Sequence, residues 1–243
     1  MQKVKVCTIC NSSVDRYLPL PDFYFEEAAK YGYPIEKSVS ETLNKIEYSC
    51  PHCGAADRER LYALYIKKLF TSVLPDEKYV FLDIAPAKSL QNFIKVNYNI
   101  DYRSMDLFMD DVTYNDSLEN TESIKDDEVD FLICSHVLEH VHNDKKALSE
   151  LHRIMKPGAS GIIMVPIDLT MQETDEDINT TEAERWARFG QYDHVRKYAK
   201  SDFLQKLDNA GFRVRELGMD FFGMDDYYTN GLTQSSILYI VKK

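Results

Sequence analysis

Residues 129–167 of the chain read VDFLICSHVLEHVHNDKKALSELHRIMKPGASGIIMVPI. Residues 129–134 form a short apolar run without a helical period, which is typical of a strand buried on both faces. A helical segment follows, and residues 161–167 form a second apolar run. Strand, helix and parallel strand in this order require a right-handed crossover, so this stretch predicts an α/β sheet.

The helix inside this stretch has recognisable ends. Asn143 or Asp144 can cap its start, and apolar residues then recur at helical spacing. Residues 156–158 (Lys-Pro-Gly) are expected to stop it, because a cation suits the negative helix end, proline cannot continue it and glycine tolerates the turn. In such sheets ligands bind beyond the carboxyl ends of the strands. The residues that leave the first strand at that edge are Ser135, His136, Glu139 and His140.

Similar patterns extend the sheet in both directions. The other predicted strands are apolar runs without a helical period, namely 79–84, 102–105, 212–217 and 236–241. The last two are expected to pair as a hairpin at the sheet edge. Further helices are predicted from a cap at Asp57, after residue 87, and from a cap at Ser201 to Gly211. The acidic segment 170–184 has no packing period and is expected to be a surface loop.

The composition excludes several classes of protein. The chain has 243 residues, enough for one large domain or a domain with a small appendage. Its net charge of -11 argues against sequence-independent binding to DNA or RNA, which needs a basic face. No apolar run approaches the roughly 20 residues of a membrane span, and the N-terminal residues lack the apolar core of a signal peptide. We therefore expect a cytoplasmic protein without nucleic-acid or membrane partners.

Four of the five cysteines form two C-x-x-C pairs, Cys7/Cys10 and Cys50/Cys53. In a reducing compartment such pairs favour a tetrathiolate Zn²⁺ site over disulfides or redox-active dithiols. Residues 1–56 are therefore predicted to form a small zinc-binding, ribbon-like module, and residues 57–243 the main domain. The long insert between the pairs is rich in tyrosine, phenylalanine and proline. It either covers one side of a substrate cleft or forms its own small core.

Two acids suggest a nucleoside ligand. Asp83 and Asp106 each end a predicted parallel strand, and an acid after the second strand can accept hydrogen bonds from both ribose hydroxyls. Asp116 could accept from an adenine amino group. The turn after the first strand, IAPAKS (residues 84–89), contains no glycine, whereas pyrophosphate binding needs G-x-G-x-x-G. A nucleoside cofactor without phosphates is therefore favoured over a dinucleotide.

Residues 79–243 resemble class I S-adenosylmethionine-dependent methyltransferases, in particular the type 11 group. The matching stretches are CSHVLEHVHNDKKALSELHRIMKPGASGIIMVPI and FGQYDHVRKYAKSDFLQKLDNAGF, where the family has "vLEHv", "LkPGG" and "H-x-R-x-Y" followed by "aGF". The resemblance implies a Rossmann-like, mostly parallel seven-stranded sheet with an antiparallel last strand. The chain departs from the family at residues 83–87, where Asp-Ile-Ala-Pro-Ala replaces acid-x-G-x-G. The cysteine module is similar to zinc modules on some sugar and natural-product methyltransferases.

The resemblance also implies residue roles. The turn containing Asp83, Ala85 and Pro86 would hold the methionine end of S-adenosylmethionine, and Asp106 the ribose. Asn115 and Asp116 are candidates for the adenine, and Ser135 and His136 for the pocket near the sulfonium.

Methylation of a hydroxyl also needs a base, and histidine suits this step because its pKa lies near neutrality. His194 is the first candidate and His136 the second. Asp193 could orient His194, and Arg196 could hold an anionic group of the substrate. Arg58 stands at a helix start, where it either binds an anion or is simply solvated.

His136 and His140 have H-x-x-x-H spacing, which binds zinc on a helix. Here the pair straddles a loop and a helix start, and Glu139 is at the wrong position for a metalloprotease. We therefore expect Glu139 and His140 to orient the loop by hydrogen bonds and not to bind a metal ion. The predicted function is methyl transfer to a small-molecule hydroxyl, with a sugar, glycan or natural-product precursor as leading acceptor. The alternatives are a binding or regulatory protein that has lost the chemistry, and a protein- or RNA-directed methyltransferase whose zinc module binds the partner.

Overall fold

The computed structural model describes residues 4–243 of the chain. A six-stranded sheet forms its centre, in the order β4-β3-β5-β6-β10-β9. The bounds of these strands are β3 Val80–Ile84, β4 Asp101–Met105, β5 Val129–Ser135, β6 Met155–Met164, β9 Arg213–Leu217 and β10 Leu238–Lys242. Strands β4, β3, β5 and β6 pair in parallel, whereas β10 is antiparallel to both β6 and β9. The predicted α/β class, with a mostly parallel sheet, is confirmed.

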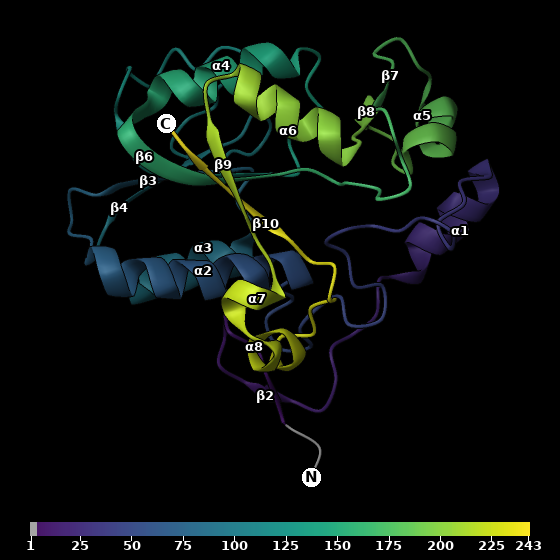
Figure 1. Ribbon diagram of the computed structural model, residues 1–243, viewed down its shortest axis with the longest axis horizontal. Coiled ribbons are helices and arrows are strands. Elements are labelled where there is room, and N and C mark those ends of the chain that lie inside the picture. Colours follow the sequence, from purple (N-terminus) through teal and green to yellow (C-terminus); the bar gives the residue numbers. More distant parts are fainter. Residues whose placement is uncertain (1–3) are drawn as a thin grey trace.

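Helices cover both faces of the sheet. Helices α2 (Asp57–Val73) and α3 (Lys88–Asn97) lie on one face, and α4 (Asp144–Ile154) and α6 (Lys200–Asn209) lie on the other (Figure 1). Strand β5 is buried almost throughout because both of its faces are covered in this way. No helix within residues 4–243 combines the length and the apolar character needed to cross a membrane.

The prediction of a seventh strand is wrong for the part of the chain that the structure describes, where the main sheet has six strands. The segment after β4 is acidic and rich in turn residues. It hydrogen-bonds to the end of β4 through Thr113 and Tyr114, but this pairing amounts to a single parallel bridge, between Met105 and Tyr114. Aspartate and asparagine are poor strand formers, which explains why pairing stops after one bridge. The residue patterns had predicted six strands, and the additional strand came from the family resemblance.

Other element boundaries differ from the sequence expectation. Helix α4 is capped by the Asn143 side chain as predicted, but it ends at Ile154, and residues 156–158 already belong to β6. Helix α6 follows Ala199, so Ser201 lies inside the helix and is not its cap. Similarly, Ala56 and not Asp57 occupies the cap position of α2.

The acidic segment 170–184 is more ordered than predicted. It contains β7 (Asp175–Glu176), which pairs with β8 (Arg196–Lys197), and the start of α5 (Glu182–Phe189). Thr181 and Glu184 form a reciprocal capping box at the start of α5. At least one acid of this segment, Glu184, therefore stabilises a helix start. The sequence contained no sign of this order, because the segment has no apolar period.

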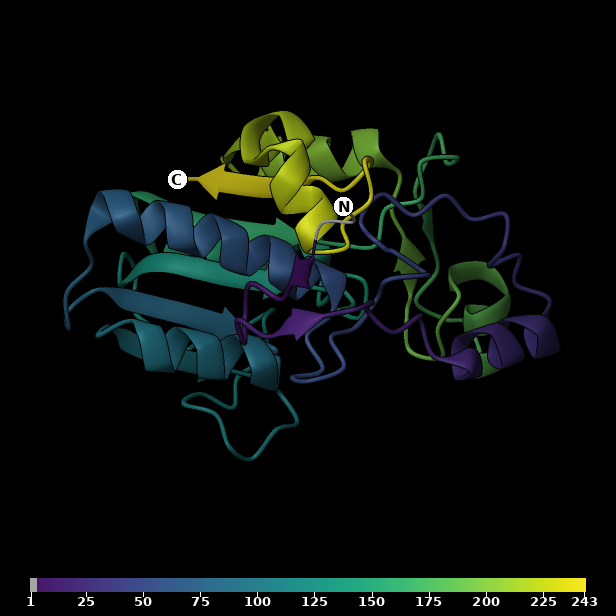
Figure 2. The same ribbon diagram turned by 90° about the horizontal axis from the view of Figure 1, so that it is seen from below.

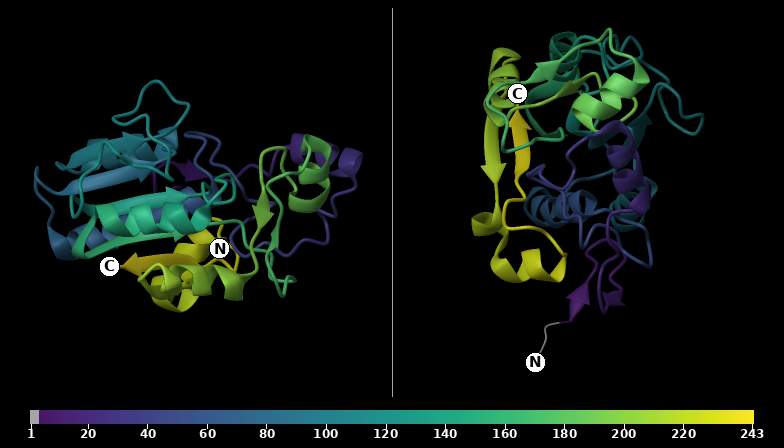
Figure 3. Two further views of the ribbon diagram at one scale, coloured as in Figure 1. Left: turned by 90° about the horizontal axis from the view of Figure 1, so that it is seen from above. Right: turned by 90° about the vertical axis from the view of Figure 1, so that its right-hand side faces the viewer.

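Residues 4–56 pack against helices of the main domain. Strands β1 (Lys5–Val6) and β2 (Ser13–Val14) pair beside α8 (Met224–Thr229), which follows α7 (Met219–Phe222) in the link between β9 and β10. Helix α1 (Asp22–Tyr31) lies alongside α5, away from the sheet (Figures 2 and 3). The Tyr31 and Trp186 rings stack there, with centroids 5.9 Å apart. The insert thus joins a segment far along the chain.

Candidate functional site

Two adjoining cavities open at the carboxyl edge of the parallel strands. The first, here called the strand-end cavity, has a volume of about 550 Å³ and is lined by residues that follow β3, β4 and β5, among them Ala85, Asp106, Asp116, His136 and Val137. The second, the insert cavity, has about 420 Å³ and is lined partly by residues 20–48. Three residues line both cavities: His136, His140 and Asp193.

Asp83 and Asp106 lie on neighbouring strands but face different surroundings. Asp83 pairs with Ser104 inside the sheet, is only 2% exposed and accepts a 2.7 Å hydrogen bond from the Tyr102 hydroxyl. Asp106 follows β4 directly and lines the strand-end cavity. Its Oδ1 accepts hydrogen bonds from the backbone N–H groups of Phe108 and Met109, which leaves Oδ2 for a ligand.

The turn after β3 holds an alanine in a conformation that normally favours glycine. Ala85 has a φ of 53° and lies at the rim of the strand-end cavity. A left-handed conformation costs a residue with a Cβ about 1 kcal/mol, and such strain persists where the surrounding structure holds it. The Ala85 N–H donates to the Met105 carbonyl across the strand ends, and Pro86 is buried.

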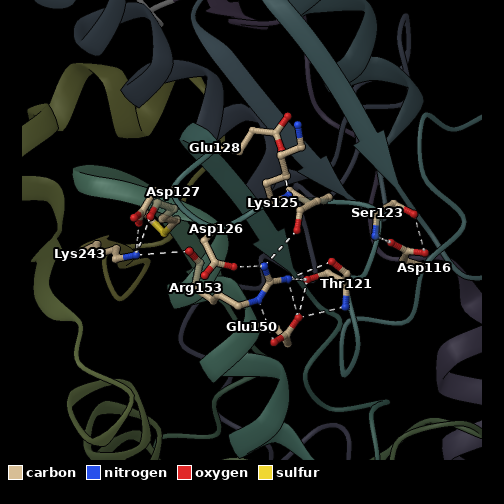
Figure 4. Close-up of polar contacts among 12 residues, drawn as sticks. Asp116, Thr121, Ser123, Lys125, Asp126, Asp127, Glu128, Glu150, Arg153 and Lys243 are labelled. Atoms are coloured by element: carbon tan, nitrogen blue, oxygen red, sulfur yellow. Dashed lines mark hydrogen bonds and ion pairs between the residues drawn. The ribbon is translucent and has the colours of Figure 1, made fainter.

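Asp116 stands in a loop that forms one wall of the strand-end cavity. Its carboxylate accepts hydrogen bonds from the Ser123 N–H and hydroxyl. Arg153 of α4 anchors the same loop by donating to the carbonyls of Thr121 and Ile124 (Figure 4). Asn115 does not line the cavity, because its amide donates to the Asp106 and Met109 carbonyls.

Three histidines surround a fully buried carboxylate where the two cavities meet. Glu139 Oε1 lies 3.3 Å from His136 Nδ1, 3.9 Å from His194 Nε2 and 4.0 Å from His140 Nε2. Neither carboxylate oxygen has a hydrogen-bond partner within residues 4–243. The loop-orienting role expected of Glu139 therefore depends on its 3.3 Å contact with His136 and on its backbone carbonyl, which accepts from the Val195 N–H. His140 Nδ1 lies 3.3 Å from Asp193 Oδ2.

The charges in this cluster shift its protonation equilibria. Burial by itself raises the pKa of Glu139, but contact with His136 and the charges of His194 and His140 hold the pKa at about 2. Burial lowers the pKa of His194 to about 4, so its imidazole is neutral at neutral pH. The hydrogen bond with Asp193 and the charge of Glu139 outweigh burial and raise the pKa of His140.

The aromatic insert forms one wall of the insert cavity. Tyr24, Tyr33 and Tyr48 line it together with the histidine cluster. Tyr33 packs against Gly190, where an added Cβ would lie 2.7 Å from the ring. Of the two sequence interpretations of the insert, the structure supports the cleft wall.

A family model described as "Methyltransferase domain" matches residues 57–217. The chain belongs to the methyltransferase-domain family. It is an S-adenosylmethionine-dependent methyltransferase. No curated protein matches its sequence.

Solved structures that resemble this methyltransferase have low sequence identity. A complex of the Haloferax volcanii Trm112 methyltransferase activator with a methyltransferase includes a chain 14% identical, covering 76% of this chain and 92% of that one, with a TM-score of 0.49. A SAM-dependent methyltransferase from Archaeoglobus fulgidus is 15% identical, with 78% of this chain and 95% of that chain covered and a TM-score of 0.45. Haemonchus contortus phosphoethanolamine N-methyltransferase 2, solved with S-adenosyl-L-methionine, is 13% identical, with 78% of this chain and 52% of that chain covered and a TM-score of 0.47.

Several predicted residues of the methyltransferase lie outside both cavities. Arg196 is fully buried, and its guanidinium donates to the carbonyls of Leu138, Val141 and His142. Arg196 therefore holds the loop after β5 in place. The prediction that it contacts an anionic group of the substrate is wrong. The Ser135 hydroxyl pairs with the Tyr62 hydroxyl at 2.7 Å and lines neither cavity.

Arg58 lines the insert cavity of the methyltransferase, as the anion-binding interpretation requires. Lys45 adds a second cation there, held by the Ile35 and Ser38 carbonyls. Nothing in the sequence singled out Lys45 or the three tyrosines as individual site residues. The only available signal was the aromatic character of the insert, which does not indicate which side chains face a ligand.

The four paired cysteines converge on one point. Cys7 Sγ lies 3.8 Å from Cys53 Sγ, and Cys10 Sγ lies 3.8 Å from Cys50 Sγ. All four sulfur atoms lie within 4.8 Å of one another. These separations are too long for disulfides, and they agree with the edge of about 3.8 Å of a tetrahedron with Zn–S bonds of about 2.3 Å.

Replacement of Asp83 by asparagine should flatten the pH dependence of stability. Burial raises the pKa of Asp83 to about 7 from an ordinary value of 3.8, against the hydrogen bond from Tyr102; Glu59 raises it further and Lys95 lowers it. The folded state therefore binds this proton more tightly, and raising the pH from about 4 to about 7 should cost up to about 4 kcal/mol of unfolding free energy. Asparagine removes the titration.

Urea unfolding from about pH 5 to about pH 8 measures this effect. The stability of Asp83→Asn relative to the native protein should rise with pH. Glu77→Gln, an exposed acid in the turn before β3, should leave the native pH slope unchanged. An unaltered slope in Asp83→Asn would contradict the prediction.

Proposed function

We propose that this methyltransferase transfers the methyl group of S-adenosylmethionine to a hydroxyl of a small molecule, with a sugar or a glycan or natural-product precursor as the acceptor class. The observation that carries the proposal is the meeting of two cavities at His136, His140 and Asp193. A donor in one cavity and an acceptor in the other would present their reacting atoms to each other at this boundary. Such positioning is the main requirement of a displacement at a methyl carbon.

The strand-end cavity is the proposed cofactor site. Asp106 Oδ2 would accept from the ribose, and Asp116 would face the adenine. Of the predicted turn, Ala85 would face the methionine end, whereas Asp83 and Pro86 are buried and would only support its shape. Asn115 would act only indirectly, through its bonds to the loop carbonyls. When bound, S-adenosylmethionine supplies an electrophilic methyl group on a sulfonium.

The insert cavity is the proposed acceptor site. A volume of about 420 Å³ suits a small molecule and is far too small for a folded protein or a duplex. Tyrosine rings offer both an apolar face for sugar C–H groups and a hydroxyl for hydrogen bonds. Arg58 and Lys45 supply positive charge in an otherwise acidic protein, which suits an acceptor that carries an anionic group.

His136 and His194 are the two candidates that could take the proton from the acceptor hydroxyl. His136 is favoured, because it lines both cavities whereas His194 lines only the insert cavity. His136 also has a φ of 58°, an unusual left-handed conformation directly after β5. Asp193 would act through His140, which it contacts.

We propose a structural Zn²⁺ at Cys7, Cys10, Cys50 and Cys53, and a division of the chain into a zinc-bearing segment, 1–56, and a methyltransferase segment, 57–243. The sulfur separations support the metal. The segments also share contacts: the Glu41 carboxylate accepts hydrogen bonds from Tyr239 and Lys200. A tetrathiolate site requires reduced thiols, which favours the cytoplasm as the compartment.

The cofactor assignment predicts a large effect at Asp106. Asp106→Asn retains the Oδ1 acceptor that holds the following loop but replaces Oδ2 by a donor. Loss of the hydrogen bonds that the ribose hydroxyls would donate to this carboxylate should weaken S-adenosylmethionine binding by about 10- to 100-fold. Isothermal titration calorimetry with S-adenosylmethionine and S-adenosylhomocysteine measures this.

The matched control is Asp110→Asn, which changes an exposed acid in the same loop that does not line the cavity, and it should bind like the native protein. If the folded native protein binds neither compound, the proposed function is wrong.

A further inference from the structure

Glu139 presents an electrostatic problem that the proposed function leaves unanswered. Its side chain is fully buried, and both oxygens lack a hydrogen-bond partner within residues 4–243. Its ion-pair contacts in this part of the chain are with three histidines and with no lysine or arginine. A buried carboxylate without a hydrogen-bonding partner is costly, and one common solution is a bound cation.

We infer that Glu139, His140 and His194 form a binding site for a divalent transition-metal ion, distinct from the cysteine site, at the end of the insert cavity next to the strand-end cavity. One ligand atom from each of these residues lies within 4.8 Å of the others. Two ligands bound at about 2.1 Å are about 3.0 to 4.2 Å apart, depending on the angle between them. The His140 and His194 Nε2 atoms lie 4.0 and 3.9 Å from Glu139 Oε1, near the wide end of this range, so an ion bound by all three residues would draw their side chains together by a few tenths of an ångström.

The surroundings of the ligands fix their orientation. Asp193 Oδ2 lies against Nδ1 of His140, which leaves Nε2 directed toward Glu139. A carboxylate behind a histidine ligand in this way sets its tautomer and orientation. The Val195 N–H donates to the Glu139 carbonyl at 2.9 Å and joins the two ligand segments. Arg196 ties the carbonyls on either side of Glu139 and His140 to the same strand.

The ligand types indicate the class of ion. Two imidazole nitrogens and one carboxylate oxygen suit Zn²⁺, Fe²⁺, Co²⁺ or Mn²⁺ better than Mg²⁺ or Ca²⁺, which prefer oxygen ligands throughout. Glu139, His140 and His194 all line the insert cavity, as does Arg58. Open coordination positions would therefore face the acceptor and could take up its oxygen atoms. This last role depends on the proposed function, but metal binding itself does not.

Co²⁺ titration of the full-length protein, with its cysteine site loaded with zinc, tests the inference. Absorption spectroscopy should detect one equivalent of Co²⁺ with weak d–d bands and without the intense sulfur-to-cobalt charge transfer of thiolate ligation. Glu139→Gln and His194→Gln should each weaken this binding at least about 10-fold, because each removes one ligand. His142→Gln should bind like the native protein, because this exposed histidine of the same loop does not contact Glu139.

Two results would overturn the site: no Co²⁺ uptake by the native protein, or equal uptake by the native protein and both ligand variants. The native titration decides the first without any variant, and thermal melts show whether each variant is folded. Calorimetry with S-adenosylmethionine on the same samples separates the two proposals. Cofactor binding without Co²⁺ uptake refutes only the metal site, whereas Co²⁺ uptake without cofactor binding refutes only the proposed function.

Discussion

Cys50→Ser should release the zinc ion and unfold the segment around the paired cysteines. Structural zinc contributes about 10 kcal/mol or more to the folding of small modules, and serine does not replace a thiolate ligand. The segment is also a wall of the insert cavity, so acceptor-dependent activity should fall with the metal. Zinc content by elemental analysis and the melting temperature measure the effect, with an expected fall of more than about 10 °C.

Cys134→Ala provides the matched control for this variant. Cys134 is buried in β5 and does not belong to the cluster of four cysteines, and burial raises the pKa of its thiol well above the usual range. The control should therefore lose a little core packing and retain the full zinc content. If Cys50→Ser kept both its zinc and its melting temperature, the tetrathiolate assignment would be wrong.

Arg60→Met should be among the most destabilising single substitutions in the chain. The Arg60 guanidinium is fully buried, stacks 3.8 Å above the Tyr17 ring and donates to the carbonyls of Glu47, Tyr48, Ala55 and Asn230. Methionine approximates its shape but leaves these acceptors without their donors. Breaking a buried charged network of this kind costs about 3 to 5 kcal/mol.

Urea unfolding of Arg60→Met measures the loss, and Arg16→Met is the control. Arg16 is exposed near the first cysteine pair, so its replacement should change the unfolding free energy by less than about 0.5 kcal/mol. Because Arg60→Met retains all four thiols, its effect on stability can be separated from metal loss by measuring zinc. A change in stability no larger than that of Arg16→Met would show that the buried guanidinium is dispensable.

The comparison of Arg60 with Arg196 and Arg58 shows where sequence interpretation reaches its limit. Arg58 and Arg60 stand two residues apart in one charged run, and nothing in that local pattern separates them. Arg58 lines the insert cavity, whereas Arg60 and Arg196 donate hydrogen bonds to backbone carbonyls of segments far away in the sequence. The side of α2 that faces the insert is set by packing between segments, and local sequence does not record it.

The sequence alone determined the order of the six central strands and of helices α2, α3, α4 and α6, the acid Asp106 after β4, and the two cysteine pairs. Those features depend on local periodicity, on turn residues and on chain order in a parallel sheet, all of which a linear pattern carries. Only the tertiary structure decided that Glu139 meets His194, that the insert closes a cavity and that no full seventh strand forms among residues 4–243. Each of these features depends on contacts between segments that are far apart in the sequence. Burial and competition among such contacts determine them, and no local pattern encodes them.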